Sequence, residues 1–151
     1  MIWTAFPFGK YINLTAPQIA FRDPDYLYWT DETVRLWGDI RIDVHTVATR
    51  ASNIRVLPLN GEDRMVEYII DQHTGRFVTV EFTLASDGPG PMRSRVIDLS
   101  MPRRFHSYDK LGGRNLVAAV KEHLFGRKRV RITREKAEDF FADETNFLRA
   151  Y

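Results

Sequence analysis

The amino-acid sequence predicts an α+β fold, with an N-terminal helical module, a three-stranded antiparallel sheet and flanking C-terminal helices. Three observations support this class. Helix signals dominate the first 60 residues, alternating strand patterns follow over residues 65–84 and 94–101, and helical patterns return over residues 114–125 and 134–142. Helices that precede and follow a group of strands, without alternating with them, are typical of α+β proteins.

Composition is that of a folded protein. The chain has 151 residues, of which 44% are hydrophobic and 28% charged, and this fits a domain with a true core. It has no cysteine, which excludes disulfides, thiolate zinc sites and a cysteine nucleophile. We find no apolar run of about 20 residues and no signal-peptide pattern, so we expect a bacterial, cytoplasmic protein without a membrane span.

Helix signals are clear in the first part of the chain. Asp23 and Pro24 form a strong helix start, because Asp caps free amides and Pro is tolerated at the first helical position. This helix is expected to run to about Trp37 and to be interrupted at Gly38. A helical turn is expected before it, over residues 16–21. The spacing of apolar residues also favours a helix over residues 39–53.

A loop follows these helices. Pro58 and the Asn60-Gly61 step are turn signals, so the sequence predicts a helical module over residues 1–60 and an α+β region over residues 61–151. The two regions can also form one compact domain.

Residues 65–84 predict an antiparallel hairpin. Apolar and polar residues alternate on both sides of the turn QHTG, which indicates two strands with one buried face. A third strand is expected over residues 94–101. Matching the apolar faces predicts the following cross-strand pairs: Val66 with Phe82, Tyr68 with Val80, and Ile70 with Val78.

The C-terminal part predicts two helices. Residues 114–125 have an apolar stripe and are followed by Gly126, a typical C-cap residue. Thr133 is expected to cap a helix over residues 134–142. Between them, residues 129–132 predict a short strand.

Two motifs near the N-terminus occur at a spacing that is compatible with one known family. The first is Pro7-Phe8-Gly9-Lys10-Tyr11, and the second comprises Asp23, Pro24, Tyr26, Leu27 and Trp29. Over residues 6–37 the chain thereby resembles the exodeoxyribonuclease X-like C-terminal domain family. The resemblance implies a non-catalytic accessory module that associates with nucleic acid. The family continues with Lys-Gly-Lys after the tyrosine, whereas this chain continues with Ile-Asn-Leu-Thr.

The same stretch has a structural interpretation. Gly9 permits a tight turn, and the aromatic residues around it can pin that turn to the helix that follows. Lys10 then remains as the residue that can meet a phosphate.

Positive charge is concentrated in one segment. The net charge is +2, but residues 93–136 carry 13 Lys/Arg against 4 Asp/Glu. Such a cluster can neutralise several phosphates of a nucleic acid. Two other interpretations of this cluster remain open. The charges can line a strand edge and prevent it from pairing with another strand, or they can form ion pairs with the acidic residues Glu138, Asp139, Asp143 and Glu144. The candidate nucleic-acid-binding residues are Lys10, Arg103, Arg104, Arg127, Lys128, Arg129, Arg131 and Arg134, with Tyr11 and Tyr28 as candidates for stacking on bases.

Other candidate sites are weaker. Glu67 and Glu81 face each other in the predicted hairpin, and two close carboxylates can bind Mg²⁺. A neighbouring Arg, or simple solvation, would also accommodate them. The helix after Gly112-Gly113 can hold an anion at its N-terminus. We therefore assign no catalytic residue, no metal and no cofactor.

The sequence favours a non-catalytic nucleic-acid-binding accessory protein of a bacterial DNA-processing, repair or mobile-element system. One alternative is a protein-interaction or assembly module whose basic face meets an acidic protein. A second alternative is a metal-dependent nuclease built on Glu67 and Glu81.

Overall fold

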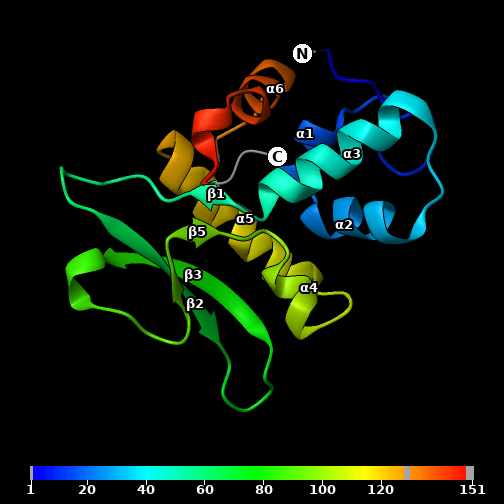
Figure 1. Cartoon of the computed structure of the whole chain (residues 1–151). Coiled ribbons are helices and arrows are strands. Elements are labelled where there is room, and N and C mark those ends of the chain that lie inside the picture. Colours follow the sequence, from blue (N-terminus) through cyan, green and yellow to red (C-terminus); the bar gives the residue numbers. More distant parts are fainter. Residues whose placement is uncertain (1, 128–129, 149–151) are drawn as a thin grey trace.

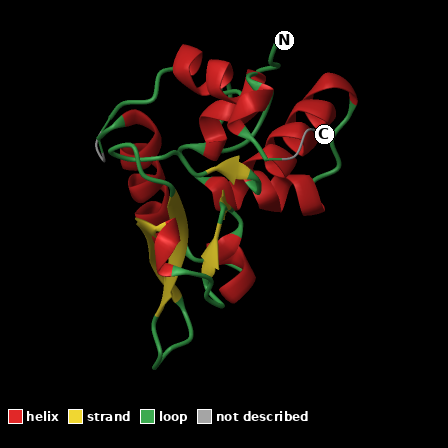
Figure 2. Ribbon diagram, turned by 60° about the vertical axis from the view of Figure 1, so that its left-hand side comes forward, coloured by secondary structure: helices red, strands yellow, loops and turns green. Residues whose placement is uncertain are grey.

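The computed structural model describes residues 2–127 and 130–148, and these form the predicted α+β fold. Helices gather at one end of the molecule, and a β-hairpin over residues 64–84 extends from the other (Figures 1 and 2). The helices are α1 (Ala16–Ala20), α2 (Pro24–Thr33), α3 (Gly38–Ala51), α4 (Met101–Phe105), α5 (Lys110–Phe125) and α6 (Arg134–Ala142). The strands are β1 (Ile54–Arg55), β2 (Arg64–Ile70), β3 (Phe77–Leu84), β4 (Arg93–Ser94) and β5 (Val96–Ile97), and two 3₁₀ turns span Ala85–Asp87 and Glu144–Asn146.

The predicted N-terminal helices are present. The Asp23 carboxylate caps α2 by accepting a hydrogen bond from the Tyr26 N–H at 3.2 Å. Helix α2 ends at Thr33, before the predicted Trp37, because Val34 takes an extended backbone conformation. The segment over residues 39–53 is largely helical, as expected, and α3 begins at Gly38 itself and ends at Ala51.

The hairpin has the predicted register over most of its length. Val66 pairs with Phe82, and Tyr68 pairs with Val80. The third predicted pair, Ile70 with Val78, is wrong because the register shifts between Ile69 and Ile70. Ile70 therefore faces Phe77, whose side chain is buried.

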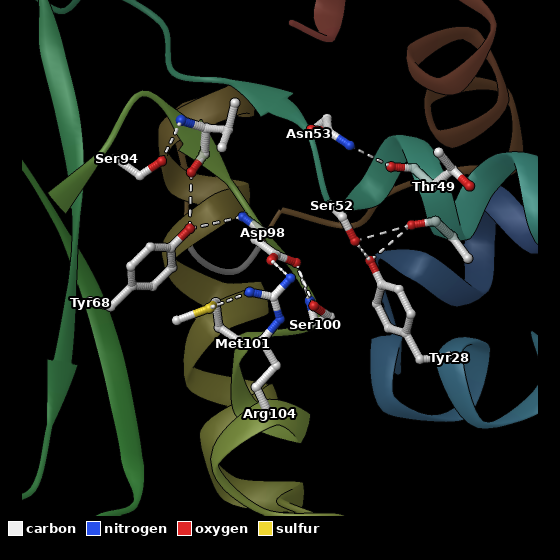
Figure 3. A network of polar contacts seen from close by, with 12 residues as sticks. Tyr28, Thr49, Ser52, Asn53, Tyr68, Ser94, Asp98, Ser100, Met101 and Arg104 are labelled. Atoms are coloured by element: carbon white, nitrogen blue, oxygen red, sulfur yellow. Dashed lines mark hydrogen bonds and ion pairs between the residues drawn. The ribbon is translucent and has the colours of Figure 1, made fainter. Parts of the chain in front are cut away.

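The strand predicted over residues 94–101 is only partly present, because Ser94, Val96 and Ile97 lie in two short strands and Met101 begins α4. Strand β4 pairs with β2 to complete the three-stranded sheet β3-β2-β4, whereas β5 leaves that sheet and pairs with β1. The Tyr68 hydroxyl lies where the chain changes sheet, donating to the Val96 carbonyl at 2.9 Å and accepting from the Asp98 N–H at 3.0 Å (Figure 3). The Tyr68 side chain thus supplies hydrogen bonds to backbone groups that have no neighbouring strand there. The chain then enters α4, with Pro102 in its first turn.

The C-terminal helices match the prediction with one extension. Helix α5 begins at Lys110, four residues before the predicted start, because Asp109 accepts a hydrogen bond from the Gly112 N–H at 2.7 Å. Gly126, with φ of +86°, ends α5 as expected. Helix α6 has the predicted bounds. The short strand expected over residues 129–132 is not formed at residues 130–132, and residue 129 lies outside the described residues.

The hydrophobic core draws on both sides of residue 60. Helix α6 packs against α1, and the Phe21 ring contacts the rings of Phe140 and Phe141 at centroid distances of 5.3 and 5.4 Å. Phe147, near the C-terminus, forms an isolated β-bridge with Ile54 of β1. Across the described residues, no helix is long and apolar enough to cross a membrane.

Candidate nucleic-acid interface

The aromatic residues of FPFGKY build a turn against α2. Gly9 has φ of +82°, a backbone conformation that favours glycine, and a Cβ atom there would lie 2.8 Å from the Tyr26 hydroxyl oxygen, which would have to shift. Phe6 is buried, and the Tyr11 ring meets the Tyr26 ring edge-on at 4.9 Å. The Tyr11 hydroxyl donates to Asp23 at 2.7 Å. The structural interpretation therefore accounts for the aromatics of this motif.

Lys10 projects from that turn. Its Nζ atom lies 3.5 Å from the Asp23 carboxylate and 5.2 Å from the centre of the Tyr11 ring, and its side chain is largely exposed. Tyr11, and to a smaller extent Asp23, raise the pKa of Lys10, which stays cationic at neutral pH. Lys10 thus places an exposed positive charge beside Asp23, the N-cap residue of α2.

A groove lined by cations lies between α1, α5 and the segment that precedes α6. It has a volume of about 600 Å³ and no acidic lining residue. We call it the basic groove, after its charged lining residues Arg22, Lys121, Arg131 and Arg134. Of these, Arg134 also forms an exposed ion pair with Glu138 at 3.0 Å.

Two cations of the basic groove, Lys121 and Arg22, repel each other. Lys121 is half-buried, and burial together with the nearby charge of Arg22 lowers the pKa of its ammonium group. Like charges held at a partly desolvated site favour an anion between them, since the anion restores the lost solvation.

A second depression adjoins the basic groove and shares Arg22 with it. Its volume is about 360 Å³, and it adds Lys10, Lys110 and Arg114 to the cations. Lys110, Arg114 and Lys121 follow one face of α5, at positions i, i+4 and i+11. We call the combined set the basic track, which comprises Lys10, Arg22, Lys110, Arg114, Lys121, Arg131 and Arg134.

Much of the charge on this track is not compensated. The second depression also contains three carboxylates: Asp23 pairs with Lys10 and accepts from Tyr11, Asp25 pairs with Arg103, and Asp109 caps α5. Within residues 2–127 and 130–148, ion pairs with carboxylates are not formed by Arg22, Lys110, Arg114, Lys121 or Arg131.

Three predicted residues therefore come together on the track, namely Lys10, Arg131 and Arg134. Arg127 is exposed directly after α5 but lines neither depression. Lys128 and Arg129 lie outside the described residues.

Two further predicted residues have compensated charges. Arg103 is mostly buried and forms ion pairs with Asp25 and Glu32, each at 3.0 Å. Arg104 pairs with the buried Asp98 at 3.0 Å, as Figure 3 shows. Both arginines tie α4 to the rest of the fold, and their charges are already paired with carboxylates.

The sequence interpretation overlooked four members of the track, which are Arg22, Lys110, Arg114 and Lys121. The spacing of the last three on one helix face was a usable signal. Nothing local marked Arg22, which lies between α1 and α2 and reaches both depressions through tertiary packing.

Tyr28 belongs to the core and is not free to stack on a base. Its side chain is only 7% exposed, and its hydroxyl donates to the Ala48 carbonyl at 3.0 Å and bonds with Ser52 at 2.7 Å (Figure 3). Tyr11 is half-buried against Tyr26.

The carboxylate pair of the hairpin has a counter-charge. Glu67 and Glu81 are opposite each other, as predicted, and the Arg93 guanidinium lies 3.8 Å from the Glu67 carboxylate. The pair therefore needs no metal ion to be accommodated. Within the part of the chain that the structure describes, no group of three or more His, Cys, Asp or Glu side chains is arranged to hold a metal ion.

Comparisons of the chain with protein-family models, with curated proteins and with solved structures found no match.

Proposed function

We propose that this protein binds nucleic acid through its basic track. One observation carries the proposal: two adjoining depressions share Arg22 and line up seven cations, of which Arg22, Lys110, Arg114, Lys121 and Arg131 form no ion pair with a carboxylate of the described residues. Phosphates spaced along a nucleic-acid backbone match such a row of Lys and Arg, and their binding releases counterions. A single small anion would leave most of the row unused.

We propose an accessory, non-catalytic role for this binding, in a bacterial DNA-processing, repair or mobile-element system. The N-terminal motifs support this role through their resemblance to the exodeoxyribonuclease X-like C-terminal domain family. The geometry supports it because two carboxylates beside the track have structural partners: Asp109 caps α5 through one oxygen, and Asp25 pairs with Arg103.

The test is binding of fluorescently labelled DNA and RNA oligonucleotides, followed by anisotropy at low salt. The variant Arg22→Ala/Lys121→Ala removes two cations from the basic groove. Its control, Arg35→Ala/Arg41→Ala, removes two exposed cations that line neither depression.

We expect the groove variant to bind about tenfold more weakly or worse, since a hydrogen bond to a charged group contributes roughly 1.5 kcal/mol or more. The control variant should bind like the parent protein. Equal losses in both variants would show that only overall charge matters, and no binding by the parent protein would refute the proposal. In that case, capture of an acidic protein would favour the assembly-module alternative.

A further inference from the structure

A third depression lies next to the second one and is lined by aromatic side chains. Its volume is about 440 Å³, within the range of roughly 300–1,000 Å³ typical of small-molecule sites. We call it the aromatic pocket, after Tyr26, Trp29 and Tyr108. Its other lining residues are Lys10, Asp23, Asp25, Arg103 and Ser107.

The aromatic rings come from different elements and are open to solvent. Trp29, on α2, is 43% exposed, and Tyr108, in the loop before α5, is 59% exposed. Tyr26 packs beside Trp29 at a centroid distance of 5.6 Å, which holds the indole in place. Burying such rings would stabilise the fold, so their exposure around one pocket indicates a surface for a flat apolar ligand.

The charges inside the pocket balance. Lys10 pairs with Asp23, and Arg103 pairs with Asp25 at 3.0 Å. Because both carboxylates are engaged, the pocket does not have the free negative charge that an aromatic cage for a cation would use. A neutral ring with polar edges fits this lining better, since the engaged groups still offer donors and acceptors.

The position of the pocket beside the cations indicates a ring that carries a phosphate. The aromatic pocket and the second depression share Lys10, Asp23, Asp25 and Tyr108, so the pocket opens directly onto the basic track. A base held in the pocket would place its own phosphate among the track's cations.

We infer that the aromatic pocket holds an unpaired base of a single-stranded nucleic acid whose backbone follows the basic track. This inference rests on the proposed function and adds the substrate class. Bases in a duplex are stacked and paired, so they cannot enter the pocket without being flipped out. Aromatic side chains beside a positively charged groove are the usual means by which proteins hold single strands.

The experiment compares four labelled ligands of about 12 nucleotides, a length within the site sizes of single-strand binders. They are oligo-dT, oligo-rU, a DNA strand of the same length with abasic sites in place of all but the terminal bases, and a DNA duplex. The abasic strand keeps the phosphates and removes the bases. The variants are Trp29→Ala and Tyr108→Ala, on two different elements, and the matched control is Trp37→Ala, whose indole is 73% exposed and outside the pocket.

We expect oligo-dT or oligo-rU to bind at least about fivefold more tightly than the abasic strand. Either pocket variant should remove most of this preference and leave binding of the abasic strand unchanged, while Trp37→Ala should change neither. Circular dichroism and thermal melts establish that each variant is folded. Tyr108→Ala keeps the inference testable if Trp29→Ala unfolds.

The inference and the proposed function fail in different ways. If the abasic strand binds as tightly as both normal strands, or if the folded pocket variants keep the full preference, the pocket holds no base. The basic track would then still bind phosphates. If none of the four ligands binds at low salt, both are refuted.

Discussion

His123 makes the stability of the fold depend on pH. The imidazole is buried on α5, and its Nε2 atom accepts a hydrogen bond from the Leu57 N–H at 2.8 Å. Its ring stacks on Phe82 at 3.9 Å, with 5° between the planes. Protonation of Nε2 would turn the acceptor into a donor that faces another donor. His123 is therefore held neutral in the folded protein.

The magnitude follows from the two pKa values. Burial lowers the pKa of His123 from 6.5 to about 4. Between these values the unfolded chain binds a proton that the folded chain does not, so stability decreases as pH falls through this window. The full difference corresponds to about 3 kcal/mol, at 1.36 kcal/mol for each pKa unit. This is an upper limit, because the ring borders an open groove that it shares with Glu81 and Glu122, where water screens the charge.

Urea unfolding at pH 7 and pH 5 measures the effect. His123→Gln keeps an acceptor for the Leu57 N–H but does not titrate. We expect the parent protein to lose up to about 2 kcal/mol more than this variant between the two pH values. His73→Gln, in the exposed hairpin turn, is the matched control and should follow the parent protein.

Two results would refute this role of His123. If His123→Gln and the parent protein lose the same stability between pH 7 and pH 5, the histidine does not contribute in this way. An NMR titration that places the pKa of His123 near 6.5 would refute the reasoning independently.

Three further predictions concern the fold. Gly9→Ala should lower the free energy of unfolding by roughly 1–3 kcal/mol, because both its positive φ and the Tyr26 hydroxyl oppose a Cβ atom; Gly75→Ala, with φ of +71° and open space, isolates the backbone part. Tyr68→Phe should cost about 1–3 kcal/mol in urea unfolding, since it leaves a buried N–H and a carbonyl without their partner. Glu81→Thr should stabilise the hairpin by about 0.2–1 kcal/mol by removing a like charge opposite Glu67, and a lower melting temperature would contradict this.

The elements that the sequence predicted are those whose signals are local. Alternating residues in the hairpin, the Asp23 cap and the Thr133 cap each determine nearby backbone, and the structure has all three. The segment 94–101 has the same alternating pattern but is divided between two sheets. The Tyr68 hydroxyl, from a strand about 30 residues away, decides that outcome through hydrogen bonds that no local pattern contains.

The candidate site was predicted only in part, because contacts between distant parts of the chain decide which basic residues come together. Basic residues clustered in the sequence pointed to Arg131 and Arg134, which do lie in the basic groove. Arg103 was in the same basic stretch, yet it faces Asp25 from another helix, and tertiary packing alone reveals that pair. The same packing brings Arg22 to Lys121, nearly 100 residues apart in the chain.

The central claim is that the basic track binds successive phosphates, and the salt dependence of binding tests it most directly. The affinity for oligo-dT and oligo-rU would be measured over a range of salt concentrations for the parent protein and for Arg22→Ala/Lys121→Ala. With four or five phosphates neutralised, log K should fall against log[salt] with a slope of about −3, and the variant's slope should be shallower by about 1.4. A slope near zero, or the same slope in both proteins, would contradict the account.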